Sequence, residues 1–193
     1  MDITQQNPQH SVGRAKKMML WFAIISMIMM FAGLTSAYVV SKSRPDWTSD
    51  IELPSGFYWS TLVILLSSIT LYLGKKSILA ENRRNATLYL TSTVVLGSIF
   101  VFLQFQSFAE IVSWGFYLTG SESSITSSFI YVIVLAHLAH LAGGIVVLFV
   151  LIYNHFKQRY RPGQMLGLEL GAIYWHFVDA LWIYLFLFLY FFR

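Results

Sequence analysis

The chain has 193 residues, of which 56% are hydrophobic, 17% are aromatic and only 11% are charged. Soluble domains carry about a quarter charged residues, so this composition excludes a soluble globular domain, and its hydrophobic content excludes intrinsic disorder. The chain has no cysteine, which excludes disulfide scaffolds, iron–sulfur clusters, thiolate zinc sites and thiolate copper sites. The class that remains is an integral membrane protein.

Five apolar stretches, between 17 and 27 residues long, follow one another along the chain: 18–40, 57–73, 86–109, 129–153 and 166–192. A helix that crosses the hydrocarbon core needs roughly 20 residues, with about 17 as the lower limit. Because lipid offers no partner to a free backbone N–H or C=O, each stretch is predicted to be helical. The sequence therefore predicts an all-α bundle of five transmembrane helices over residues 18–193, preceded by a polar tail at residues 1–17.

The Lys and Arg residues predict the orientation of this bundle. Ten of the 13 lie before the first stretch or in the connections that follow the second and fourth stretches. Only Lys42, Arg44 and Arg193 lie on the other side. Since Lys and Arg accumulate on the cytoplasmic side, the N-terminus is predicted to be cytoplasmic and the C-terminus periplasmic. The net charge of +4 is then an orientation signal, and we expect no nucleic-acid partner.

Five ionisable side chains lie within the last two predicted helices, namely His137, His140, Glu169, His176 and Asp179. An Asp near the centre of a membrane helix costs about 2.5–3.5 kcal/mol. Glu169 and His176 are two helical turns apart and Asp179 follows His176 by one turn, so these three share one side of their helix. We expect this side to face the two histidines, so that the five side chains form an internal polar network that orders the two helices.

Two other interpretations of these residues stay open. Histidines on neighbouring helices, together with a carboxylate, could bind haem or a metal in an independent membrane protein. A series of His and carboxylate groups could also relay protons in a proton-coupled transporter. An absorption spectrum of the isolated chain separates the first of these from a purely structural network, and a transport assay in vesicles separates the second.

The last predicted helix resembles a known family. Its residues Gly167-Leu168-Glu169, then Tyr174-Trp175-His176-Phe177-Val178-Asp179 and Trp182, are similar to the C-terminal helix of subunit III of haem–copper oxidases. Two further segments, His137-Leu138-Ala139-His140 and Glu81-Asn82-Arg83-Arg84, resemble other parts of that subunit. The likeness runs from about Leu20 to Arg193, and the chain resembles the shorter bacterial form with five helices.

The resemblance implies an accessory subunit, not catalytic by itself, of a cytochrome c or quinol oxidase in the inner membrane of an aerobic bacterium. Such a subunit would bind oxidase subunits I and II, which hold the haem and copper, and could belong to a respiratory supercomplex. It would hold phospholipids and support proton uptake and enzyme lifetime during oxygen reduction. The residues agree that this chain carries no redox centre: of its five His, only His137, His140 and His176 lie in predicted helices away from their ends.

One position departs from the family. Members usually place a buried Glu in the helix that matches the first stretch here, whereas this sequence reads Ile24-Ile25-Ser26-Met27. Met27 can neither hold nor pass a proton, so a proton-uptake role is not carried over to this residue.

Overall fold

The computed structural model describes residues 8–45, 47, 53–116, 124–160 and 165–192. Within these ranges the chain forms five helices and no strand: α1 (Pro8–Ser41), α2 (Ser55–Leu79), α3 (Arg83–Ser113), α4 (Ile125–Phe156) and α5 (Leu166–Phe192). All five are long and apolar enough to cross a membrane. The predicted all-α architecture with five spanning helices is therefore confirmed.

The first four helices are longer than the apolar stretches that they contain. The clearest case is α1, which begins at Pro8 and so includes residues 8–17 of the segment expected to be a polar tail. The added turns carry polar and basic side chains that the membrane surface can solvate, while the helix still satisfies its own backbone hydrogen bonds. Hydropathy reports the thickness of the hydrocarbon core rather than the length of the helix.

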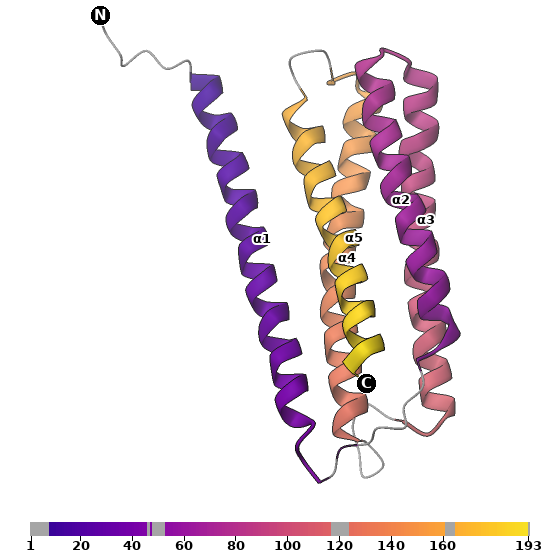
Figure 1. Ribbon diagram of the computed structural model, residues 1–193. Coiled ribbons are helices and arrows are strands. Elements are labelled where there is room, and N and C mark those ends of the chain that lie inside the picture. Colours follow the sequence, from indigo (N-terminus) through magenta and orange to yellow (C-terminus); the bar gives the residue numbers. More distant parts are fainter. Residues whose placement is uncertain (1–7, 46, 48–52, 117–123, 161–164, 193) are drawn as a thin grey trace, which may run out of the picture.

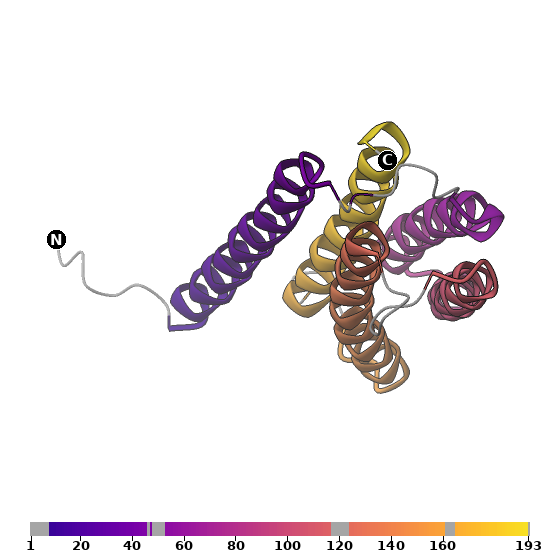
Figure 2. The same ribbon diagram turned by 90° about the horizontal axis from the view of Figure 1, so that it is seen from below.

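The five helices are not equally packed. Viewed along the bundle, α4 and α5 lie between α1 on one side and the α2–α3 pair on the other (Figure 2). Within the described residues, the backbone of α1 approaches only α4 and α5, whereas α5 contacts α1, α2 and α4. The helices run alternately up and down, so that α1 begins at one end of the bundle and α5 ends at the other (Figure 1). The ends of α2 and α4 and the starts of α3 and α5 therefore lie at the same end as the start of α1. We call this the N-terminal end.

The segment Glu81-Asn82-Arg83 forms the turn between α2 and α3. Glu81 adopts the left-handed conformation with φ of 56°, and the N–H of Asn82 bonds back to the carbonyl of Ser77 at 3.0 Å. The Asn82 side chain then accepts a hydrogen bond from the N–H of Asn85, at 3.3 Å, and caps α3. The same φ of 56° recurs at Gln158, just after α4. The acidic–Asn–basic segment is thus a tight connector between antiparallel helices.

Candidate functional site

Two tryptophans of α5 lie at the centre of the bundle. Trp175 and Trp182 are 1% and 0% exposed and are the two largest fully buried side chains among the described residues. They are seven residues apart, which is close to two full turns, so both rings leave the same side of the helix. Their surroundings show how α5 meets its neighbours.

The indole of Trp175 contacts three helices at once. Its Nε1 donates a hydrogen bond to Oγ of Ser67 on α2, at 3.1 Å. Its six-membered ring lies between Gly97 of α3 and Gly144 of α4: a Cβ added to these glycines would lie 2.9 Å from Cη2 and 3.0 Å from Cε3, respectively. The two missing side chains therefore create the slot that the ring fills.

Trp182 repeats this arrangement two turns further along α5. Its Nε1 donates a hydrogen bond to Oγ1 of Thr61 on α2, at 3.0 Å. Its ring makes edge contacts with Phe57 of α2 and Phe100 of α3, with centroids 5.5 and 5.1 Å away, and lies 5.2 Å from the ring of His137 on α4. Each tryptophan thus joins α5 to α2, α3 and α4.

The polar side chains of α5 between these tryptophans face α2. Nδ1 of His176 lies 2.6 Å from Oγ of Ser68, at hydrogen-bonding distance. Asp179 is only 2% exposed and lies beside the same serine. Within the described part of the chain, neither carboxylate oxygen of Asp179 has a hydrogen bond of normal geometry. Ser68 is therefore the polar neighbour that His176 and Asp179 share.

Hydroxyl groups of α2 line its contacts with both α3 and α5. Besides Ser67 and Ser68, Oγ of Ser60 accepts a 2.8 Å hydrogen bond from Nε2 of Gln104 on α3. Thr61 bonds Trp182, as described above. These residues were not among those predicted from the sequence, although a signal was present: the pairs 60/61 and 67/68 are seven residues apart and so lie on one side of the helix. Small polar residues at such positions are typical of membrane helix interfaces.

The two histidines of α4 do not meet the acidic groups of α5. His137 is fully buried against the rings of Phe100 and Trp182, and neither of its ring nitrogens has a hydrogen-bond partner among the described residues. Nδ1 of His140 lies 2.7 Å from the carbonyl oxygen of Ala136, within its own helix. The carbonyl oxygen of His140 accepts a 2.9 Å hydrogen bond from Oη of Tyr174. The Tyr of the family motif therefore fixes α5 to α4 through the backbone.

Glu169 turns to α1. Its Oε2 lies 2.9 Å from Nζ of Lys17, and the two side chains are 38% and 48% exposed. The five residues expected to form one network are thus separated: Glu169 pairs with α1, His176 and Asp179 lie beside α2, and the rings of the two histidines of α4 pack against aromatic rings of other helices. No hydrogen bond or ion pair joins any two of them within the described ranges. Helical spacing identifies the side of a helix, but α5 has neighbours on several sides, and the sequence does not say which neighbour each residue meets.

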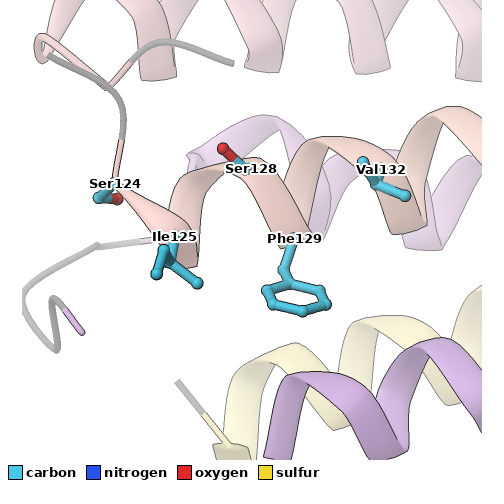
Figure 3. Close-up of a pocket in the computed structure, with 5 residues that line it drawn as sticks. All are labelled: Ser124, Ile125, Ser128, Phe129 and Val132. Atoms are coloured by element: carbon cyan, nitrogen blue, oxygen red, sulfur yellow. The ribbon is translucent and has the colours of Figure 1, made fainter. Parts of the chain in front are cut away.

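Within the part of the chain that the structure describes, no three His, Cys, Asp or Glu side chains gather in a group that could hold a metal ion. The bundle does contain two hollows lined mainly by apolar side chains. One lies between α1 and α5 and measures about 380 Å³. The other measures about 290 Å³ and lies at the start of α4, where Ile125 and Phe129 point to the same side (Figure 3).

Met27, where the resemblance led us to expect a Glu, lies on the packed side of α1. Met27 is 7% exposed and stands one turn before Phe31, whose ring contacts that of His140 at 5.7 Å. A thioether at this place contributes packing and offers no proton.

Comparisons with known proteins agree with the sequence motifs. The profile of the family "Cytochrome c oxidase subunit III" matches residues 4–193. The chain is 28% identical over 193 residues to a probable cytochrome c oxidase subunit 3 of Mycobacterium leprae, covering 95% of this chain and 92% of that protein. It is 26% identical over 171 residues to cytochrome c oxidase subunit 3 of Corynebacterium diphtheriae, covering 85% and 82%.

A third relative, cytochrome bo(3) ubiquinol oxidase subunit 3 of Buchnera aphidicola, is 26% identical over 187 residues and covers 93% and 88% of the two chains. The bacterial relatives and the five spanning helices identify a multi-pass protein of the bacterial inner membrane. Since the family profile covers nearly the whole chain, the protein belongs to the cytochrome c oxidase subunit III family of haem–copper oxidases.

Proposed function

We propose that this chain is a non-catalytic subunit of a terminal haem–copper oxidase, in which it stabilises the catalytic subunit during oxygen reduction. The observation that carries the proposal is the place of the family motif in the fold. Tyr174, Trp175, His176 and Trp182 all bind or contact other helices of this chain. The residues of the motif thus hold the helices together, as an accessory subunit requires. In a redox enzyme the histidines would instead be expected to bind haem or a metal.

In this role the chain binds oxidase subunits I and II, and the haem and copper belong to those partners. The buried histidines fit this assignment, because His137 lies among aromatic rings and His140 bonds its own helix, so neither joins a set of ligands. Similar proteins are named for a cytochrome c oxidase and for a ubiquinol oxidase. Either electron donor, and a larger supercomplex, is compatible with the fold.

The proposal includes two supporting tasks. The outward faces of the helices, which are apolar, hold phospholipids at the edge of the oxidase. The chain also supports proton uptake, but not through Met27, so any such support depends on other residues. The basic residues at the N-terminal end favour a cytoplasmic N-terminus and a periplasmic C-terminus.

The test is purification of the tagged chain in a gentle detergent, followed by mass spectrometry of the accompanying proteins and an absorption spectrum. We expect two larger oxidase subunits and a haem spectrum that is lost when those subunits are removed. His137→Ala and His176→Ala should leave the spectrum of the complex unchanged. A chain that purifies alone with a haem band sensitive to these substitutions would instead be an independent haem protein. Ion transport by the chain alone in vesicles would identify a transporter.

A further inference from the structure

A carboxyl group lies at the middle of the last helix. Asp179 is the central residue of α5 (Leu166–Phe192) and is only 2% exposed. Among the residues that the structure describes, neither of its oxygens has a hydrogen-bond partner and no basic side chain forms an ion pair with it. An ionised carboxylate without donors or a counter-charge is costly to bury, and such a group takes up a proton instead. The surroundings of Asp179 therefore favour its neutral form.

The hydroxyl group of Ser68 is shared by this acid and a histidine. Its Oγ lies 2.6 Å from Nδ1 of His176, and Asp179 lies beside the same hydroxyl. A hydroxyl group has one hydrogen to donate and two lone pairs that accept, so Ser68 can donate to only one of its two neighbours. When Asp179 is protonated, its O–H can donate to Oγ while Ser68 donates to Nδ1, and no charge is buried. When Asp179 is ionised, Ser68 must donate to the carboxylate and His176 must donate from Nδ1.

These residues follow one another towards the N-terminal end of the bundle. His176 precedes Asp179 by one turn of α5, and Lys75 follows Ser68 by two turns of α2. Both steps lead to the end where α2 stops and α5 begins. Lys75 lies close enough to His176 to act on it electrostatically. Because His176 and Ser68 are partly exposed whereas Asp179 is buried, the histidine is the accessible end of this group and the acid is its buried end.

The titratable residues of the other neighbouring helices lie on other sides of α5. Lys17 of α1 pairs with Glu169, two turns before His176. The rings of His137 and His140 of α4 pack against aromatic rings. The protonation of the acid and of the histidine beside it is therefore governed by their burial, by Ser68 and by the Lys75 charge.

We propose that Asp179, Ser68 and His176 form a proton-binding site inside the membrane, in which Asp179 holds the proton and His176 exchanges it with the N-terminal end. In the release step Asp179 gives its proton to Oγ of Ser68 while the hydroxyl proton of Ser68 passes to Nδ1 of His176. This leaves a carboxylate, an unchanged hydroxyl group and an imidazolium, which then releases its Nε2 proton; uptake is the reverse. The site depends on α2 and α5 alone and so goes beyond the proposed function, and it gives the proposed support of proton uptake residues other than Met27.

The first experiment detects the proton. Asp179→Asn is purified as the whole oxidase complex, with Glu169→Gln as the matched control, because Glu169 is partly exposed and paired with Lys17. Infrared spectra at neutral pH are compared with those of the unaltered complex. We expect a carbonyl band of a protonated carboxylic acid that shifts in D₂O, disappears in Asp179→Asn and stays in Glu169→Gln. Should Asp179→Asn fail to assemble, Asp179→Glu keeps the carboxyl group and should move the band. The absence of such a band, or a band that neither Asp179 substitution changes, would overturn the inference.

The second experiment follows the exchange of that proton. The complex is transferred from H₂O to D₂O, and the rate at which the Asp179 band shifts is recorded. We expect this rate to fall at least about tenfold in His176→Gln and in Ser68→Ala. It should be unchanged in His140→Gln, the matched control, because Nδ1 of His140 bonds its own helix. Equal rates in all three variants would mean that the proton reaches Asp179 by another path, which overturns the proposed site. Co-purification of the haem-bearing chains, recorded in the same preparations, tests the proposed function separately.

Discussion

The close approach of Gly97 and Gly144 to Trp175 predicts how much stability a methyl group at Gly97 would cost. In Gly97→Ala, the added methyl group would lie 2.9 Å from Cη2 and 3.1 Å from Cζ2 of the indole. Movement of the ring is restricted, because Gly144 approaches its Cε3 and Cζ3 equally closely and Ser67 accepts a hydrogen bond from its Nε1. Overpacking of this kind costs typically 1–3 kcal/mol. A Gly→Ala change in a helix also contributes about 1 kcal/mol of favourable helix propensity, which partly hides that cost.

Gly33→Ala is the control that isolates the packing cost. A Cβ on Gly33 would meet nothing within 4 Å, so this variant gains the helix propensity without the clash. The propensity gains cancel between the two variants, and we expect Gly97→Ala to be less stable than Gly33→Ala by about 1–3 kcal/mol. The assay is the free energy of unfolding of the detergent-solubilised chain, measured by reversible titration with SDS and followed by circular dichroism.

A double-mutant cycle shows whether Trp175 is the cause. Phenylalanine lacks the indole atoms that approach Gly97, so in a Trp175→Phe background the cost of Gly97→Ala should largely disappear. Residues in direct contact show such coupling, typically 0.5–3 kcal/mol. If Gly97→Ala costs the same in both backgrounds, or matches Gly33→Ala, the slot does not determine the packing and the reasoning is refuted.

Three further predictions use the same unfolding assay. Ser68→Ala removes the hydrogen-bond partner of His176 and should cost about 1–3 kcal/mol, whereas an unchanged stability would mean that water replaces the hydroxyl. Gln158→Gly relieves the left-handed backbone after α4 and should stabilise the chain by up to about 1 kcal/mol, and any loss would show that the side chain matters more than φ. Lys17→Gln breaks the ion pair with Glu169 and should cost less than about 1 kcal/mol, with the difference from the unaltered chain vanishing at high salt.

The five helices could be predicted from the sequence because the bilayer imposes a length and an apolar character that hydropathy measures directly. The helix ends could not, because the turns beyond the hydrocarbon core are polar. That is why α1 begins at Pro8 and not at the first apolar residue. The turn at Glu81 and Asn82 was visible as a motif, but its left-handed residue and its cap became evident only in the structure.

The sequence identified several polar residues of the candidate site but not the residues that they contact. Spacing placed His176 and Asp179 on one side of α5, and the structure places both near Ser68 of α2. From the sequence alone we expect them to face α4, since its two histidines are the conspicuous polar groups of the neighbouring helices. Serine side chains are small and common, so Ser67 and Ser68 do not stand out in the sequence. They nevertheless form the hydrogen bonds to Trp175 and His176.

The burial of the family motif between the helices can be explained by the lipid that surrounds the bundle. Lipid is as apolar as a leucine side chain, so helices in a membrane gain little from burying apolar surface and depend on close packing and interhelical hydrogen bonds. A tryptophan supplies both, because its ring fills the space left by a glycine and its Nε1 needs an acceptor. Trp175 and Trp182 each find that acceptor on α2 and fill space beside α3 and α4. A motif built from such residues determines how the subunit is folded, and the chemistry of the oxidase can then reside in its partners.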